Sequence, residues 1–332
     1  MPATSLRRLR GPVCAGLLCV AGVGMAQPAL DHADYPQRPI RLIVADSPGS
    51  ADEFFARLVG ERLERRYGHR VMIDTRAGAG GLIGNTLVSR ASADGYTLAM
   101  VGVTRLITAL LREQPPYRAL ADVTGVAHVA SITNVLVIAP SLHARTAQDF
   151  VRHARANPGD LNYASQGIGS ASHLAGEIFS RALGIDAVHV PYRKVINTFA
   201  EMGLGRVHYA VLTLPTVLPA VRKERLRPLA VMTPVRSGVL PEVPSVHELG
   251  LPDAQFDSWS GVVAPVGTPR RIVEQLHGDI VVALRDAPLR QRFLHQGAES
   301  TPEGTPDGFM RLMQEEYLRF EEMIRGSNIR PE

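Results

Sequence analysis

Three short stretches of small residues lie where a predicted strand passes into a predicted helix. They are residues 47–50, 76–81 and 165–170, and they consist largely of Gly, Ser and Ala. A helix N-terminus exposes unpaired backbone N–H groups and carries a partial positive charge, so it can hold a carboxylate or a phosphate without an Arg side chain. Three such loops in one chain therefore predict an anion site built from backbone, although Gly and Ser could also serve only as turns and caps.

The motifs that would indicate catalysis or nucleotide binding are missing. The glycines at 78–84 do not have G-x-G-x-x-G spacing because Ile83 takes the last position, and no Walker A lysine or G-x-S-x-G serine is present. The histidines include no H-E-x-x-H pair, which disfavours a zinc hydrolase. His173 could touch a ligand or simply begin a helix. The single tryptophan, Trp259, fits core or hinge packing better than a stacking platform.

The elements that must position these loops alternate between strand and helix, which predicts an α/β architecture with largely parallel sheets. Residues 123–142 contain no charged side chain except histidine, and their Gly, Ser, Asn and Pro interruptions favour two buried strands over a membrane helix. Strands are expected at 40–45, 71–73, 96–103, 161–164, 188–190, 207–212, 229–232 and 261–263, and helices at 52–66, 82–91, 172–183, 272–285 and 309–325.

Length and charge limit the classes of protein. At about 150 residues per domain, 332 residues predict two domains. The net charge of +4 includes Arg7, Arg8 and Arg10, and without these three it is +1. A clustered basic face is therefore not indicated, and no nucleic-acid partner is expected.

Residues 1–26 have the pattern of a secretory signal peptide, with a basic start, an apolar run and a small-x-small end at Gly24 to Ala26. Cleavage there would make Gln27 the first residue of a periplasmic protein. The apolar run of about 15 residues is short for a bilayer, so an uncleaved anchor is the weaker alternative. Both cysteines, Cys14 and Cys19, fall in this segment, so the mature chain would contain no thiol.

An ordered set of motifs resembles the tripartite tricarboxylate transporter substrate-binding proteins, also called Bug receptors. Each motif is weak alone, but together they run from residue 35 to the C-terminal helices. They are YPQRPIRLIV at 35–44, RAGAGG at 76–81, DGYTL at 94–98, HLAGE at 173–177, VPY at 190–192 and WSG at 259–261, followed by Ala264-Pro265.

The resemblance implies a two-domain periplasmic binding protein, type II-like, in which each domain is a mostly parallel sheet flanked by helices and a cleft lies between them. Domain 1 would comprise residues 27–132 and 259–332, and domain 2 residues 133–258. It also implies a monomer that captures a small organic carboxylate and delivers it to a membrane permease. Neither catalysis nor a cofactor nor a metal is expected. A ligand sensor for a membrane signalling partner and, less favoured, a periplasmic hydrolase remain alternatives.

Matching the family's loops onto this sequence gives the candidate ligand-binding residues. In this match Asp46 replaces an aromatic residue, Glu53 an Asp, and Lys194 a glycine. The candidates, with residues of the neighbouring loops added, are Asp46, Ser47, Gly49, Ser50, Asp52, Glu53, Gly78, Ala79, Gly80, Gly81, Thr104, Ser165, Gln166, Gly167, Gly169, Ser170, His173, Arg193 and Thr213.

Asp46 raises the question of which ligand such a cleft would accept. A carboxylate near helix N-termini that favour anions would be costly unless it meets a donor. Either the ligand supplies an ammonium or hydroxyl group, as an amino or hydroxy acid does, or Arg105 or Arg193 neutralises Asp46. A third alternative is that Asp46 points to solvent or caps the next helix. Among these we expect a ligand with one carboxylate and a donor group such as an amine.

Overall fold

The structure, a computed structural model, describes residues 35–327 and 329. These residues belong to one unit of the chain, Tyr35–Glu332. The predicted signal peptide lies outside the described residues. Within the part that is described, no helix is both long and apolar enough to cross a membrane.

One half of the sheet contains β1 (Ile40–Val44), β2 (Val71–Thr75), β3 (Thr97–Gly102) and β9 (Asp257–Pro265). β1 lies between β2 and β3 and is parallel to both, and β9 runs antiparallel to β3. The apolar run of β1 is buried on both faces, because alternate side chains enter different clusters. Leu42 and Val44 pack with α1 (Ala51–Tyr67), α8 (Arg270–Arg285) and α9 (Ala287–Leu294). Ile43 packs with α2 (Leu82–Ser89), α3 (Thr104–Leu110) and α10 (Pro306–Arg325).

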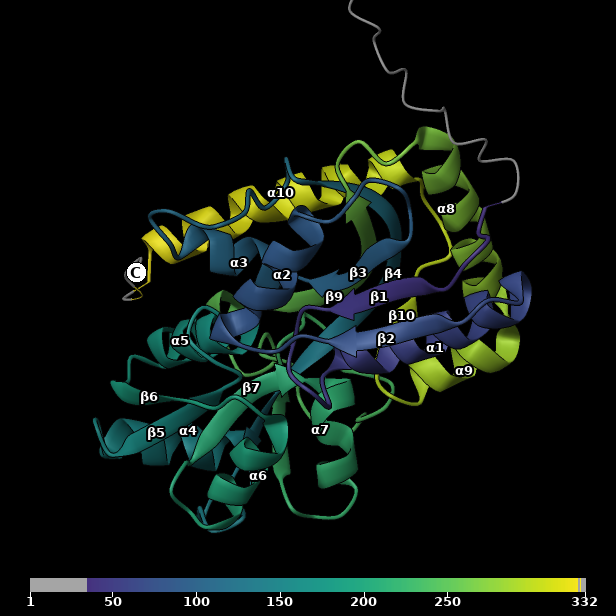
Figure 1. Cartoon of the computed structure of the whole chain (residues 1–332). Helices are drawn as coiled ribbons and strands as arrows, with labels where there is room; N and C mark the ends of the chain where they lie inside the picture. Colours follow the sequence, from purple (N-terminus) through teal and green to yellow (C-terminus); the bar gives the residue numbers. More distant parts are fainter. Residues whose placement is uncertain (1–34, 328, 330–332) are drawn as a thin grey trace, which may run out of the picture. The chain divides into compact units, whose positions relative to one another are not determined.

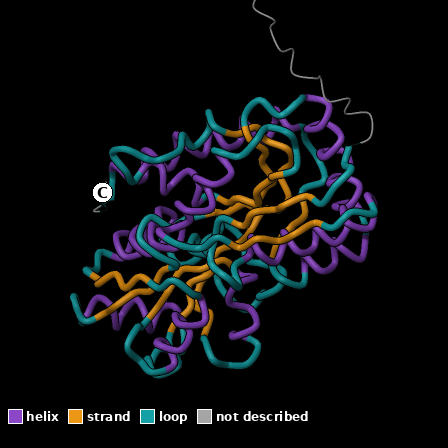
Figure 2. Tube along the Cα trace, in the orientation of Figure 1, coloured by secondary structure: helices purple, strands orange, loops and turns teal. Residues whose placement is uncertain are grey.

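The other half contains β5 (Leu161–Ser165) between β6 (Ala187–Pro191) and β7 (Tyr209–Thr213), all parallel. The helices α4 (Ala147–Ala156) and α5 (Ala171–Leu183) cover one face, where Phe150 and Phe179 stack. The other face carries α6 (Val195–Gly203) and α7 (Leu214–Val221). The strands form a band with helices on both sides (Figure 2).

One strand joins the two halves. β4 (Val123–Ile138) pairs with β9 as far as Thr133 and with β7 and β8 (Arg227–Val231) from Asn134 onward. The expectation of two strands in this region was wrong, because Gly125 and His128 mark shifts of register against β9 and not turns. The strand order is β2-β1-β3-β9-β4-β7-β5-β6, with β10 (Ala298–Ser300) also on β4. The strands at the two ends of this order are thus parallel to their neighbours, and the central strands β9 and β4 are antiparallel to theirs (Figure 1).

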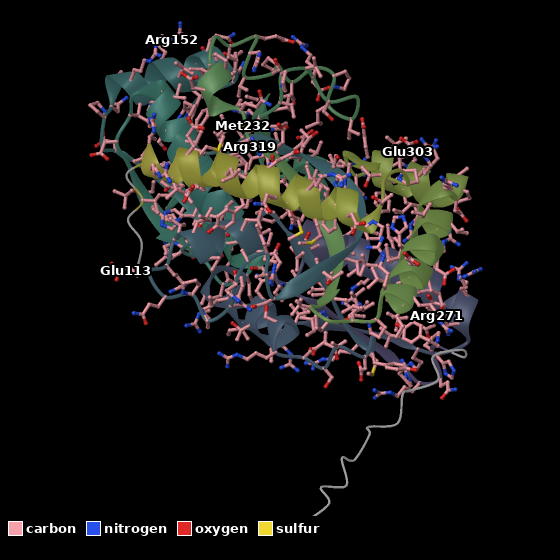
Figure 3. All side chains as sticks on the ribbon, turned by 90° about the horizontal axis from the view of Figure 1, so that it is seen from above. Glu113, Arg152, Met232, Arg271, Glu303 and Arg319 are labelled. Atoms are coloured by element: carbon pink, nitrogen blue, oxygen red, sulfur yellow. The ribbon has the colours of Figure 1, made fainter. Side chains whose placement is uncertain are left out.

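The C-terminal helix α10 packs on β4 and α3. Figure 3 shows this helix lying across one face of the molecule, with Arg319 on it. The predicted helices α1, α2, α5, α8 and α10 are present within three residues of their expected bounds. α3, α4, α6, α7 and α9, the strand β10, and the short 3-10 turns η2 (Ala79–Gly81) and η3 (Pro252–Ala254) were not predicted.

Candidate ligand-binding site

The first predicted loop joins β1 to α1. Ser50 caps α1 by accepting a hydrogen bond from Glu53 N at 3.3 Å. Asp46 Oδ1 accepts from Ser47 N at 2.6 Å. Glu53 accepts from Gly49 N at 2.7 Å and also pairs with Arg57, so its carboxylate is already used in holding the loop.

The third predicted loop joins β5 to α5. Ser170 caps α5 by accepting from His173 N at 3.3 Å. Gln166 N donates to Ser172 Oγ at 2.9 Å, and Ser165 Oγ lies 3.1 Å from Gly167 O. Side chains of the loop thus fix its backbone at the start of α5.

A small, partly open cavity of about 30 Å³ lies between these two loops and the central strands. A space of that size holds about one water molecule, so a larger ligand can enter only if the loops separate. The lining residues come from both halves of the sheet. They are Asp46, Ala51, Asp52, Gly102, Val103, Thr104, Ile132, Asn134, Gln166, Ala171, Ser172, Leu212, Thr213, Ser258 and Trp259.

Two carboxylates dominate the electrostatics of this cavity. Asp52 is 6% exposed and accepts a hydrogen bond from Ser260 Oγ. Burial raises the pKa of Asp52, and the nearby charge of Asp46 raises it further. Burial also raises the pKa of Asp46, against the hydrogen bonds of Ser47 and Ser50 that lower it. The pair is therefore arranged to keep a proton at pH values where an ordinary Asp is ionised.

The second predicted loop lies beside the third loop and does not line the small cavity. Gly80 has a φ of +61°, and a side chain there would collide with Ile168 O. Thr108 Oγ1 lies 2.6 Å from Gly80 O and 2.9 Å from Gly169 O. The second loop and α3 thus hold the third loop in place.

Two stacked histidines, His173 and His189, contact the third loop and support it. The rings of His173 and His189 are 3.8 Å apart and nearly parallel. Gly169 N donates to His173 Nδ1 at 3.2 Å, and Ser165 Oγ lies 2.6 Å from His189 Nε2. Burial lowers the pKa of His173 to about 4 and that of His189 to about 3. Both rings are therefore neutral at pH 7, and His173 acts here as a loop support.

The structure brings some of the predicted residues together at the cavity and leaves others beside it. Arg193 is exposed, and the structure does not show the expected neutralisation of Asp46 by its side chain. The cavity is lined by five of the predicted residues, namely Asp46, Asp52, Thr104, Gln166 and Thr213. Ser47, Gly49, Ser50, Glu53, Ser165, Gly167, Gly169, Ser170 and His173 shape the first and third loops, and Gly78, Ala79, Gly80 and Gly81 form the second.

Arg105 does not neutralise Asp46. Its guanidinium is fully buried and donates to Ala119 O at 2.8 Å and to Asn85 Oδ1 at 3.1 Å. It also lies over the ring of Tyr117. Arg105 thus ties α3 to the segment that follows it, and the expectation that it might face Asp46 was wrong.

Sequence reasoning missed the contribution of the central strands. Asn134 Nδ2 donates to Phe256 O at 2.9 Å and to Ser258 Oγ at 2.8 Å. Asn134, Ser258 and Trp259 all line the cavity. The one available signal was Asn134, a polar residue within a long apolar run, which was interpreted as an interruption between strands.

A second, larger cavity of about 880 Å³ shares Ile132, Ser258 and Trp259 with the small one. It is otherwise lined mainly by residues 233–239 and by the segment that follows α9, and none of the predicted residues borders it. The helix N-termini of α1 and α5 meet at the small cavity, so the candidate site is placed there.

Known proteins are similar to this chain in sequence and fold. The protein BugT of Bordetella pertussis is 33% identical over 310 residues, which cover 92% of this chain and 94% of BugT. An R. palustris protein solved with adipate is 31% identical, with a TM-score of 0.86 over 90% of this chain and 100% of that one. MatC of Rhodopseudomonas palustris, solved with bound malate, is 27% identical, with a TM-score of 0.82 over 87% of this chain and 100% of that one.

A family model also matches most of this chain. Residues 55–329 match the tripartite tricarboxylate transporter family receptor. This match covers most of the chain, including both halves of the sheet and the loop that carries Gln166. The chain therefore belongs to the tripartite tricarboxylate transporter receptor family, whose members are solute-binding receptors.

Proposed function

We propose that this protein is a periplasmic receptor that binds a small organic carboxylate in the cavity between the first and third loops and delivers it to a tripartite tricarboxylate-type permease. The observation that carries the proposal is the meeting of the α1 and α5 N-termini, each capped by a serine, around one small cavity. Helix N-termini are suited to a carboxylate. The adipate-bound and malate-bound relatives support this ligand class.

The proposed mechanism is capture by closure. The two loops belong to different halves of the sheet, and β4 and β9 connect those halves. The proposal includes two domains that divide at 132/133 and 258/259. The change in the pairing partners of β4 between Thr133 and Asn134 supports the first of these boundaries. A ligand that touches both loops would favour the closed arrangement, and the permease would receive that form.

Binding is tested with the chain beginning at Gln27, stripped of any carried ligand by unfolding and refolding. A thermal-shift screen would cover dicarboxylates, hydroxy acids, amino acids and aromatic acids. A ligand at 100 times its dissociation constant adds about 2.7 kcal/mol to the free energy of unfolding. If none of these carboxylates stabilises the protein, the proposed function is wrong.

Gln166 supplies a test of the site. Its side chain lines the cavity, so Gln166→Ala should weaken binding of a carboxylate hit by about 1 to 2 kcal/mol, as expected for one hydrogen bond to a charged group. Isothermal titration calorimetry measures this change. Unchanged affinity would place the ligand elsewhere, with the larger cavity as the alternative site.

Uptake tests the delivery step. Cells that lack this gene should lose accumulation of the radiolabelled hit and regain it with the intact gene. Normal accumulation without the gene would argue against a transport role.

A further inference from the structure

The charge of the small cavity does not suit a ligand made only of carboxylates. Asp46 and Asp52 both line it, and the fifteen lining residues include no Lys, Arg or His. Asp52 accepts from Ser260 Oγ, and Asp46 accepts from Ser47 N and from the Ser50 hydroxyl, which leaves acceptor positions open on both carboxylates. A plain dicarboxylate would add negative charge where no cation is present to offset it.

Two residues that line this cavity also carry donors that lack acceptors. Trp259 is 5% exposed, and its Nε1 is buried without a hydrogen-bond partner among the described residues. Gln166 Nε2 is likewise buried and unpartnered. Buried donors in proteins are nearly always paired, so two open donors that belong to lining residues indicate a group that arrives from outside.

We propose that the ligand is a small zwitterion, in which an ammonium group binds Asp46 and Asp52 while a carboxylate accepts from Gln166, Trp259 and the helix N-terminus of α5. This inference rests on the proposed function, since it assigns the ligand class of the same site. The two open acceptors and the two open donors are then satisfied by one molecule that carries both kinds of charge. Asp46 and Asp52 act as the residues that determine specificity.

A metal ion is a poorer occupant of the acidic pair. Within residues 35–327 and 329 no group of three or more His, Cys, Asp or Glu side chains is placed to hold a metal. A cation bound by two carboxylates would also leave the open donors of Gln166 and Trp259 without an acceptor. An ammonium group, which donates up to three hydrogen bonds, fits two carboxylates directly.

Matched ligand pairs test the inference by calorimetry. Aspartate differs from succinate by one ammonium group, and 4-aminobutyrate replaces one carboxylate of glutarate with an ammonium. Alanine and propionate form a third pair. We expect the ammonium member of at least one pair to bind at least tenfold more tightly than its partner.

Variants then assign the preference to the acidic pair. Asp46→Asn and Asp52→Asn should each weaken binding of the ammonium ligand at least tenfold while leaving binding of the plain carboxylate equal or stronger. Asp160→Asn is the matched control, because it also removes one carboxylate but lies exposed before β5. Circular dichroism and thermal unfolding would establish that each variant folds.

Proton release gives an independent readout. The groups that face the pair are Glu53, whose charge raises the pKa of Asp46, and the hydroxyls of Ser50 and Ser260, which lower the pKa values. A bound ammonium favours ionised carboxylates, so zwitterion binding at pH 7 should release protons. Calorimetry in buffers of different ionisation enthalpy measures their number, and Asp52→Asn should reduce it.

The outcomes separate the two proposals. If plain dicarboxylates bind as tightly as or more tightly than their ammonium partners and protons are taken up, the zwitterion inference is overturned while the carboxylate receptor stands. If no member of any pair binds, the proposed function fails with it. Tight ammonium binding that survives both Asp variants also overturns the assignment to this pair.

Discussion

Asp52 is a buried carboxylate with a hydroxyl and a second carboxylate as neighbours, and its charge is unfavourable without a ligand. Its pKa is raised in the folded chain above the ordinary value near 4. The folded protein therefore holds this proton more tightly than the unfolded chain, and the stability it contributes at low pH is lost as pH rises through the raised pKa. We expect Asp52→Asn to raise the free energy of unfolding at pH 8.5 by about 1 kcal/mol or more, and less at pH 5.

Urea unfolding of the ligand-free protein at both pH values measures this difference. Asp160→Asn, which changes an exposed carboxylate, should show no such pH dependence. An equal loss of stability in Asp52→Asn at both pH values would mean that Asp52 acts through its hydrogen bond to Ser260 and not through its charge.

At the level of single residues, the sequence predicted which loops carry polar groups but not where side chains point. Asp46 and Asp52 were expected at the site because the family's first loop was matched onto residues 45–53. The direction of Arg105 depends on Asn85 and Ala119, which only the folded chain brings near it. Trp259 was predicted as packing, and its open Nε1 became visible only with its surroundings.

Among the elements, the third loop depends on the neutral state of two histidines. Protonation of His173 would remove the acceptor for Gly169 N and place a charge against the ring of His189. The pKa of His189 is lowered to about 3 by burial and by His173, so its contribution to stability is complete above the unfolded value near 6.5 and is lost as pH falls below it.

His189→Gln removes one of these titrating groups and keeps a polar side chain near Ser165. The loss of unfolding free energy between pH 7 and pH 4.5 should be smaller than in the unaltered protein by about 1 kcal/mol. Chemical denaturation across this range is the measurement. If both proteins lose the same stability, other groups cause the acid sensitivity.

Elements with strong local signals were predictable, and elements defined by distant partners were not. The strand-loop-helix units around β1, β2 and β5 each have an apolar run, small residues and a helical pattern. Helix α4 was missed although Thr146 and Asp149 form a capping box at its start. The length of β4 was not predictable because β9, β7 and β8 determine where it pairs.

For the whole molecule, the proposed closure would depend on contacts between the two halves of the sheet. α3 follows β3 in one half, and the third loop follows β5 in the other. Thr108 Oγ1 of α3 lies 2.9 Å from Gly169 O of that loop. A side-chain carbon built on Gly169 would lie 3.8 Å from the Thr108 Cα atom, so the two positions are near enough to be joined by a disulfide, although the φ of +76° at Gly169 strains a cysteine there.

The pair Thr108→Cys and Gly169→Cys should therefore lock the loops together. The chain's two natural cysteines, Cys14 and Cys19, precede the predicted mature start at Gln27, so the introduced thiols could pair only with each other in the protein beginning there. Because the cavity of about 30 Å³ admits a ligand only when the loops separate, the oxidised variant should bind more than tenfold more slowly in stopped-flow measurements. A reducing agent should restore the rate, and each single cysteine variant should bind at the same rate with or without reductant.

Unchanged binding by the fully oxidised double variant would show that the ligand enters without separation of α3 from the third loop.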